Sequence, residues 1–518
     1  MAFDFVIVGG GSAGCVLAAR LSEDPAVKVC LLEAGGPPSD PDISDPAKWP
    51  LLQGRDIDWQ FATMPQAGTA GRVHAWPRGH ALGGSSNLHA MAHVRGHPLD
   101  FDGWAELGCT GWAYADLMPY FMKSETSPHG PSPYHGNSGP IRLMKPKNPH
   151  PITAAYMAAA EEQGLAPTDD HDGPVMAGPT LNALTIVGGK RQSVFDAYLR
   201  PITGRTNLSI RTGCLVDRVL IGKNGKATGV ISVDGTAENT VHASSAVVLC
   251  GGVMASPAIL LRSGLGNANE LSALGIPAIA DLPGVGENLH DHLLAGGNLY
   301  RSKRPVPPTQ HQHSESLLYI AGQSADPRPS MALACVTVPV VTECFQAPPM
   351  GQAYTIMYGF THPKSRGRLR FHSRDPRAKP LADPNYLSAP EDLTTYLEAL
   401  TWARDIGAAS SLDDWRDKEI LPGPKVNSRA ELESFLAQAA FTHHHPVGTC
   451  KMGQDELAVV GPDLAVKGIS GLFVMDASII PAITTGPINA AIVAMAERAS
   501  HLLLKKAPLS SDDPRLHP

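Results

Sequence analysis

Three consecutive histidines near the C-terminus, His443, His444 and His445, are the residues whose types and spacing point most directly to chemistry. In an extended segment successive side chains point to opposite faces, so we expect His443 and His445 to share one face and His444 to lie on the other. Two imidazoles are too few ligands for a closed zinc site unless Asp, Glu or Cys joins them, so no metal is expected. An acid–base pair above a bound cofactor suits the spacing better.

A glycine-rich turn at the start of the chain offers a place for such a cofactor. The apolar run 3–8 leads into the turn, a helical pattern follows, and a second apolar run ends at Glu33. Strand, turn, helix, strand and acid in this order predict a dinucleotide-binding unit. Gly9 allows the tight turn, Gly11 lets backbone approach a pyrophosphate, and Gly14 lets the helix pack on the strand. Glu33 is placed to accept hydrogen bonds from ribose hydroxyls. The motif alone does not distinguish NAD from FAD.

Length and composition restrict the other classes of function. A chain of 518 residues is too long for one simple core and predicts roughly two or three domains. Its 43% apolar and 18% charged residues are typical of soluble globular proteins, and a net charge of −7 argues against nucleic acid as a partner. No apolar run approaches the length of a membrane span, which is about 18 residues. The first strand begins by residue 3, which leaves no room for a signal peptide, and the eight cysteines form no CxxC pair. We therefore expect a cytoplasmic protein with reduced thiols, and a monomer or a weak oligomer.

A second glycine- and serine-rich stretch, residues 79–96, precedes a helical pattern. Adjacent Gly83 and Gly84 followed by two serines predict a cradle for an anion or for a ring edge. The alternative is an ordinary turn in which Ser85 or Ser86 caps the following helix. Composition leaves both interpretations open.

Together these stretches resemble the glucose–methanol–choline (GMC) oxidoreductases, FAD-dependent enzymes that act mostly on alcohols. The resemblance runs essentially end to end. Residues 79–96 are similar to the first family signature, 252–266 to the second, 283–292 to its VGxNLxDH run, and 362–368 to a further landmark. It implies an α/β fold (α+β overall), with a Rossmann-like FAD-binding domain and a second, sheet-based substrate domain.

The resemblance also implies which residues contact FAD. Val216 is expected to offer backbone to adenine, and Asp476 to lie near the ribityl and phosphate groups. The complete expected set is Gly9, Gly11, Ser12, Ala13, Gly14, Glu33, Ala34, Gly83, Gly84, Ser85, Asn87, Leu88, His89, Ala90, Val216, Gly251, Asp476, Ala477, Pro487, Ile488 and Asn489.

Some positions depart from the family pattern. His89 stands where Asn is usual near the flavin, His93 where an aromatic is common, and Val253 where a small residue or proline is usual. Some family members attach FAD covalently through a histidine one residue before that Asn. Leu88 occupies this place, so noncovalent FAD is predicted.

His445 falls where the family has its catalytic histidine. An alcohol hydroxyl has a very high pKa, so hydride cannot pass to flavin N5 until the proton is being taken, and a neutral imidazole is a suitable acceptor. The family carries a second catalytic His or Asn directly after a glycine, whereas this chain has Pro487, which offers neither an N–H nor a side-chain acceptor. We therefore hypothesise a His443/His445 pair, in which one ring is the base and the other donates to the developing alkoxide. The sequence leaves open which ring takes the proton.

The His-x-His pattern with this proline is most similar to family members that oxidise the 4-hydroxymethyl group of pyridoxine, a form of vitamin B6. Oxidation of pyridoxine to pyridoxal is thus predicted, with oxygen or another electron acceptor, and an oxidase is favoured over a dehydrogenase. The alternatives are another alcohol (of the hydroxymethylfurfural, aryl-alcohol or choline type), a hydroxynitrile lyase with a structural flavin, and a flavin-binding module without catalysis.

For the domain layout, we expect the FAD-binding domain to comprise 1–150, 195–292 and 441–506, the substrate domain to comprise 151–194 and 293–440, and 507–518 to be a flexible tail. The Pro- and His-rich loop 304–314, with His311 and His313, is interpreted as a solvated surface or lid loop rather than a metal site. Further expectations are a helix opened by Gly251 and Gly252 with Pro257 near its start, a helix over 393–406, and strands at 208–211, 215–221, 227–233, 246–250, 332–341 and 353–358.

Overall fold

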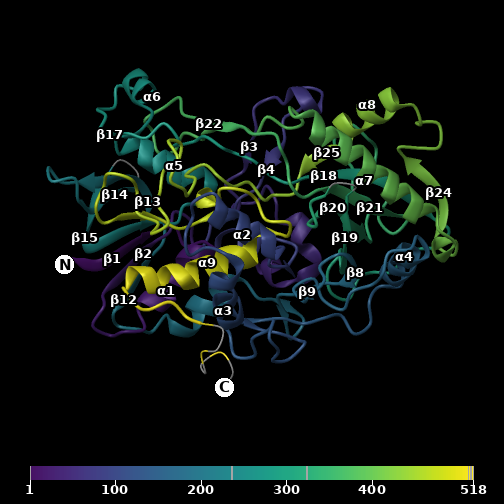
Figure 1. Cartoon of the computed structure of the whole chain (residues 1–518), viewed down its shortest axis with the longest axis horizontal. Coiled ribbons are helices and arrows are strands. Elements are labelled where there is room, and N and C mark those ends of the chain that lie inside the picture. The colour runs from purple at the N-terminus through teal and green to yellow at the C-terminus, as the bar shows by residue number, and fades with distance from the viewer. Residues whose placement is uncertain (1, 235–236, 323–324, 511–512, 514–515, 517–518) are drawn as a thin grey trace.

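The computed structural model describes residues 2–234, 237–322, 325–510, 513 and 516, and two sheets dominate it (Figure 1). The first sheet has the order β12-β2-β1-β15-β14-β13, with β26 added beside β15. Strands β1, β2, β12 and β26 run parallel to their neighbours, whereas β13 and β14 form an antiparallel extension. The bounds are β1 (Phe3–Val8), β2 (Val29–Leu32), β12 (Leu208–Arg211), β13 (Leu215–Ile221), β14 (Ala227–Asp234), β15 (Ala237–Leu249) and β26 (Leu472–Val474).

Helices cover the parallel part of this sheet. Helix α1 (Ser12–Leu21) packs against α9 (Ile488–Leu503), and α9 packs against α3 (Tyr114–Ser124). The strand β2 is buried along its whole length, as expected for a parallel strand with both faces covered. The position of α1 between β1 and β2 is the one that the glycine motif predicts.

The second sheet is antiparallel, with the order β24-β18-β21-β20-β19-β8 and with β25 paired to β18. Helix α7 (Pro390–Ala408) packs on β20 and β21, and Tyr396 of α7 joins Tyr354 and Tyr358 of β21 in a second hydrophobic core. The bounds are β8 (Gly178–Leu181), β18 (Leu293–Ser302), β19 (Ser316–Ala321), β20 (Pro329–Val336), β21 (Ala353–Phe360), β24 (Arg416–Leu421) and β25 (Ala440–Thr442).

The remaining helices and strands are shorter or connect the two sheets. The helices are α2 (Pro98–Glu106), α4 (Pro151–Glu162), α5 (Gly252–Arg262), α6 (Ala268–Ala273) and α8 (Arg429–Ala439). The paired short strands are β3 (Phe61–Ala62) with β4 (Ala75–Trp76), β5 (Ala92–His93) with β9 (Ala183–Leu184), β6 (Glu125–Thr126) with β7 (Ile141–Arg142), β10 (Ile186–Val187) with β11 (Lys190–Arg191), β16 (Leu265–Gly266) with β17 (Ala280–Asp281), and β22 (Arg368–Arg370) with β23 (Leu381–Asp383). Within the described residues, no helix has the length and apolar character needed to cross a bilayer.

Two expected helix starts differ from the structure. After Gly83 the chain makes only one 3₁₀ turn, Gly84–Asn87, and Met91 has a φ of 61°, which is incompatible with a continuing helix. Pro257 lies inside α5 rather than near its start. The strand expected at 332–341 ends at Val336, and the one expected at 246–250 is the end of the longer β15.

The described part of the predicted tail, 507–518, packs against the protein. The Leu509 N–H donates to the Tyr120 hydroxyl at 3.0 Å, and Leu509 and Leu516 are buried against the first core. Residues 511–512, 514–515 and 517–518 lie outside the described part.

Candidate active site

A cavity of about 1040 Å³ is lined by residues from both sheets. Its volume matches the upper end of pockets that hold small molecules and cofactors, about 300–1,000 Å³. The starts of α1, α5 and α9 and the histidine segment 443–445 all reach it. It therefore brings the glycine motif and the histidines, which lie at opposite ends of the chain, to one space.

The glycine turn has the geometry that a dinucleotide requires. Gly9 has a φ of 104°, and a Cβ there would lie 2.4 Å from the Cys250 carbonyl oxygen. A Cβ on Gly14 would lie 1.9 Å from the Gly9 carbonyl oxygen, so only glycine allows α1 to pack this closely on β1. At Gly11, by contrast, the nearest atom to such a Cβ is 3.9 Å away. No side chain caps the start of α1 at Gly11, which leaves its N–H groups available for an anion.

Glu33 lies at the end of β2 and lines the cavity. Its side chain is buried and accepts hydrogen bonds from the N–H groups of Gly10 at 2.7 Å and Gly35 at 2.9 Å. Burial raises the pKa of this carboxyl group, and the two N–H groups counteract that effect. The acid is thus fixed beside the glycine turn, where it fits a ribose.

Most of the predicted site residues line this cavity: Gly9, Gly11, Ser12, Ala13, Glu33, Ala34, Gly84, Ser85, Leu88, His89, Ala90, Val216, Gly251, His443, His445, Asp476, Ala477, Pro487, Ile488 and Asn489. Gly14, Gly83 and Asn87 lie behind the lining. The Gly83 N–H donates to the Gly10 carbonyl at 2.7 Å, and the Asn87 amide donates to the Leu82 carbonyl at 2.9 Å. These residues support the loop that faces the cavity.

The histidine segment follows directly after β25, which pairs antiparallel with β18. The His443 N–H donates to the His292 carbonyl at 2.9 Å, and the His445 N–H donates to Asp291 at 2.8 Å. His444 has a φ of 65°, so the segment is not a strand and the alternation argument does not apply to it. The left-handed residue nevertheless brings the His443 and His445 rings to 4.3 Å between centroids, and His444 lines the cavity as well.

A third imidazole, His292, joins the pair, and the sequence interpretation did not assign it a role. Its Nδ1 lies 3.0 Å from Nδ1 of His445. Burial lowers the pKa of His292 to about 4, and burial together with neighbouring imidazoles lowers those of His443 and His445 well below 6.5. All three rings are therefore neutral at pH 7. The signal was present in the Asp291-His292 pair that ends the 283–292 run.

The three rings form a group that could hold a metal ion, because their potential ligand atoms all lie within 4.8 Å of one another. Within the described residues, no carboxylate or thiolate belongs to this group. Two of the rings, His292 and His445, also form a hydrogen-bonded pair, and the ring of His443 lies beside it.

Further polar groups at the cavity lack partners. Nε and Nη2 of Arg78 and Nε1 of Trp49 are buried without a hydrogen-bond partner among the described residues. His89 accepts the Met91 N–H on Nδ1 at 3.0 Å, and burial followed by Arg191 lowers its pKa to about 3. Its neutral ring therefore carries hydrogen on Nε2. These donors fit a bound group rich in acceptors, such as a flavin ring.

The C-terminal part of the site is formed by α9 and the turn before it. Pro487 precedes α9 and contributes no N–H, and the Asn489 amide donates to the Ser12 hydroxyl at 2.9 Å, which joins the starts of α9 and α1. Asp476 is buried and accepts from the Gly252 N–H at the start of α5. Burial raises the pKa of Asp476.

The loop 304–314, expected to be a surface or lid loop, is exposed over much of its length but not at its C-terminal end. His313 is half-buried, with Nε2 3.0 Å from the Ala47 carbonyl oxygen and Nδ1 3.2 Å from the Thr337 hydroxyl. Gln312 and His313 line the cavity. This end of the loop is thus part of the cavity wall.

Comparison with known proteins identifies the family. Residues 3–294 and 363–496 match the N-terminal and C-terminal domains described as GMC oxidoreductase. The chain belongs to the GMC oxidoreductase family. It is 44% identical to pyridoxine 4-oxidase of Microbacterium luteolum, over 96% of this chain and 98% of that protein. It is 36% identical to mitochondrial choline dehydrogenase of Homo sapiens, over 99% of this chain and 91% of that protein. The crystal structure of pyridoxine 4-oxidase from Mesorbium loti superposes with a TM-score of 0.93 at 44% identity and covers 96% of this chain and 98% of that one.

GMC oxidoreductases are flavoproteins that bind FAD, and the predicted family, fold class and enzyme class are confirmed. The protein is an FAD-dependent alcohol oxidoreductase with a mixed α/β fold. The open backbone at Gly11, the uncapped start of α1 and the buried Glu33 fit such a dinucleotide.

Proposed function

We propose that this enzyme oxidises the 4-hydroxymethyl group of pyridoxine to pyridoxal and uses oxygen as the electron acceptor. The observation that carries the proposal is the His443/His445 pair, with rings 4.3 Å apart in the same cavity as Pro487. The 44% identity to pyridoxine 4-oxidases along nearly the whole chain supports the same substrate.

In this proposal the FAD-binding domain comprises 1–150, 195–292 and 441–506, is Rossmann-like, and holds FAD noncovalently. The start of α1 and Glu33 bind the ADP part, while the stretch 84–90, Asp476, and the start of α9 at Pro487 border the flavin part. Bound FAD supplies the hydride acceptor. Leu88 supports noncovalent binding, because no nucleophile stands at the position where some relatives attach the cofactor.

The protein's own contribution is proton transfer and orientation. His445 accepts the hydroxyl proton as hydride leaves the carbinol carbon, and His443 donates a hydrogen bond to the developing alkoxide. Both rings are neutral at pH 7, which such a base requires. The substrate domain, 151–194 and 293–440, closes the cavity over the substrate through β19, β20 and the loop that carries His313.

The proposal also places the enzyme in the cytoplasm, as a monomer or a weak oligomer. All eight cysteines are free thiols, and Cys344 is exposed, which suits a reducing compartment.

Anaerobic flavin reduction tests the substrate. The holoenzyme is mixed with pyridoxine, benzyl alcohol, hydroxymethylfurfural or choline, and bleaching of the flavin absorbance is followed. We expect pyridoxine to reduce the flavin fastest and air to restore the colour with release of peroxide. Faster flavin reduction by any other alcohol refutes pyridoxine as the preferred substrate. Reoxidation of the flavin by a dye but not by air refutes oxygen as the electron acceptor. Acid denaturation is expected to release all flavin into the supernatant, and flavin that stays with the polypeptide contradicts noncovalent binding.

A further inference from the structure

The two ring nitrogens of His292 have different partners. Nε2 lies 2.8 Å from the carbonyl oxygen of Thr361. A carbonyl oxygen only accepts hydrogen bonds, so this nitrogen carries the hydrogen. Burial, and next the neighbouring His362, lowers the pKa of His292 to about 4, so the ring is neutral. Its Nδ1 therefore has a bare lone pair.

That lone pair determines where His445 carries its hydrogen. Nδ1 of His292 and Nδ1 of His445 are 3.0 Å apart, and a hydrogen bond between them needs one proton. Because His292 has none on this atom, the Nδ1 of His445 must donate. A neutral imidazole has one N–H, so the Nε2 of His445 is left bare.

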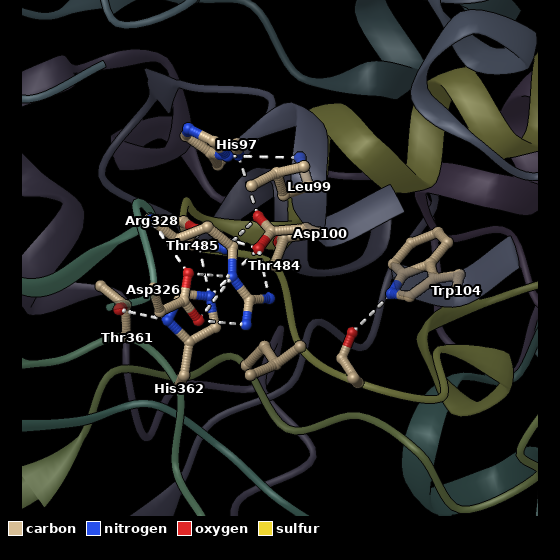
Figure 2. Close-up of polar contacts among 12 residues, drawn as sticks. His97, Leu99, Asp100, Trp104, Asp326, Arg328, Thr361, His362, Thr484 and Thr485 are labelled. Atoms are coloured by element: carbon tan, nitrogen blue, oxygen red, sulfur yellow. Dashed lines mark hydrogen bonds and ion pairs between the residues drawn. The ribbon is translucent and has the colours of Figure 1, made fainter. Parts of the chain in front are cut away.

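The carbonyl at the start of this chain of contacts is firmly held. The Thr361 N–H donates to the Ser330 carbonyl at 3.0 Å, and its hydroxyl donates to the Pro329 carbonyl at 2.6 Å. Figure 2 shows that the next residue, His362, reaches the Thr361 hydroxyl with Nδ1 at 2.9 Å and Asp100 with Nε2 at 3.0 Å. Asp100 is buried and also accepts from the Thr485 N–H at 2.6 Å. The Thr361 carbonyl is therefore a fixed acceptor.

We propose that His292 is a positioning residue that fixes the tautomer of His445, so that Nε2 of His445 is the atom that takes the substrate proton. In the reaction the alcohol O–H bond breaks and an N–H bond forms at this Nε2. The C–H bond electrons leave as hydride to FAD, and the carbonyl product forms. The resulting imidazolium keeps its Nδ1–H on His292, which disperses the new charge. The reaction step depends on the proposed function, whereas the tautomer is a property of the resting enzyme.

His443 lacks an equivalent arrangement. Its ring contacts those of His445 and His292, but no hydrogen bond from the described residues reaches its nitrogens. Nothing comparable fixes its tautomer, so it is free to turn a hydrogen toward the alkoxide. This assigns the base role to His445 and the donor role to His443.

Two matched variants separate positioning from mere anchoring. In His292→Asn the side-chain oxygen replaces the acceptor at Nδ1 and the contact with Thr361 is lost. In His292→Gln the amide N–H replaces the donor at Nε2, and the acceptor for His445 is lost. We expect the His292→Asn variant to keep the rate constant of anaerobic flavin reduction within about tenfold of wild type. The same rate constant should fall by about a hundredfold or more in His292→Gln, which is in the range of general-base effects. Flavin content and melting temperature serve as folding controls. Equal losses, or a greater loss in Asn, overturn the inference.

The wild-type holoenzyme offers a test that needs no folded variant of His292 and no substrate. Labelling with imidazole-¹⁵N histidine and comparison with His445→Asn identifies the His445 signals in the NMR spectrum. We expect a bare Nε2 and a protonated Nδ1. The opposite tautomer overturns the inference, as does an Nδ1 without hydrogen accompanied by one equivalent of bound metal. If pyridoxine fails to reduce the flavin while the tautomer is as expected, only the proposed substrate is refuted. The rates of the His292 variants are then measured with benzyl alcohol as the substrate.

Discussion

The Thr449 hydroxyl donates a hydrogen bond to the carbonyl oxygen of Val253 at 2.7 Å. That carbonyl lies in the first turn of α5, and its regular helical donor would be the N–H of residue 257. Pro257 has no N–H, so Thr449 supplies the missing donor from the segment that carries the proposed catalytic histidines. The second family signature and the histidine motif are thus joined by one contact.

Replacing Thr449 tests this contact. Thr449→Val keeps the shape but leaves a buried carbonyl without a donor, and we expect the unfolding free energy to fall by about 1–3 kcal/mol. Thr449→Ser, which keeps the hydroxyl, should lower the unfolding free energy by a smaller amount. Thermal melting of the holoenzyme followed by flavin fluorescence measures both. A Thr449→Val protein as stable as wild type would show that α5 needs no substitute donor.

The base assignment makes a pH prediction. Burial and the neighbouring imidazoles place the pKa of His445 well below 6.5, so the ring becomes protonated and inactive only below that pH. The acid limb of flavin reduction by substrate should therefore lie below pH 6.5, with a constant rate from there to pH 8. An acid limb at or above pH 6.5 would contradict neutral histidines at the site.

The two histidines proposed to be catalytic should differ in how much activity their replacement removes. His445→Asn should slow anaerobic flavin reduction by about 10²–10⁴-fold, since it removes the proposed general base. His443→Asn keeps a side-chain donor and should slow flavin reduction by a smaller factor. His444→Asn serves as the control from the same segment. Flavin content should stay unchanged in all three variants, and a larger loss in His443→Asn than in His445→Asn would reverse the assigned roles.

Glu33 should control FAD affinity. Glu33→Gln places an amide NH₂ against one of the N–H donors of Gly10 and Gly35, so the turn is distorted. Loss of a hydrogen bond to a charged group costs about 1.5–3 kcal/mol, which weakens FAD binding about tenfold to a hundredfold. Reconstitution of apoprotein with FAD, followed by fluorescence quenching, measures the Kd. Glu23→Gln, at an exposed site after α1, is the matched control and should bind FAD like wild type.

A buried charge network away from the cavity should make stability pH-dependent. Burial lowers the pKa of His135, but hydrogen bonds to Asp170 and Glu125 outweigh burial and raise it to about 9, while nearby Arg95 opposes the rise. Because the folded pKa exceeds the unfolded value of about 6.5, this stabilisation is complete below pH 6.5 and is lost as pH rises through about 9. The melting temperature of wild type should exceed that of His135→Asn by most at pH 6 and by least at pH 10. A difference that does not change with pH would rule out a charged His135.

The sequence predicted well the features that depend on neighbours in the chain. The turn at Gly9–Gly14 and the flanking elements β1, α1 and β2 follow from glycine sterics and apolar runs alone. The helix expected after Ser85 fails because Met91 adopts a left-handed conformation, which the apolar pattern does not encode. His292 could not be placed either. It lies 153 positions from His445 in the chain, and only the antiparallel pairing of β18 with β25 brings them together.

The order of strands in the first sheet has a consequence for folding. β1 lies along one edge of β15, and β26 (Leu472–Val474) lies along the other edge. The start of α9, which bonds to the start of α1 through Asn489 and Ser12, comes later still. Asn489 and Ser12 are 477 positions apart in the chain, so the wall beside the nucleotide loop forms only when these two distant segments fold against each other.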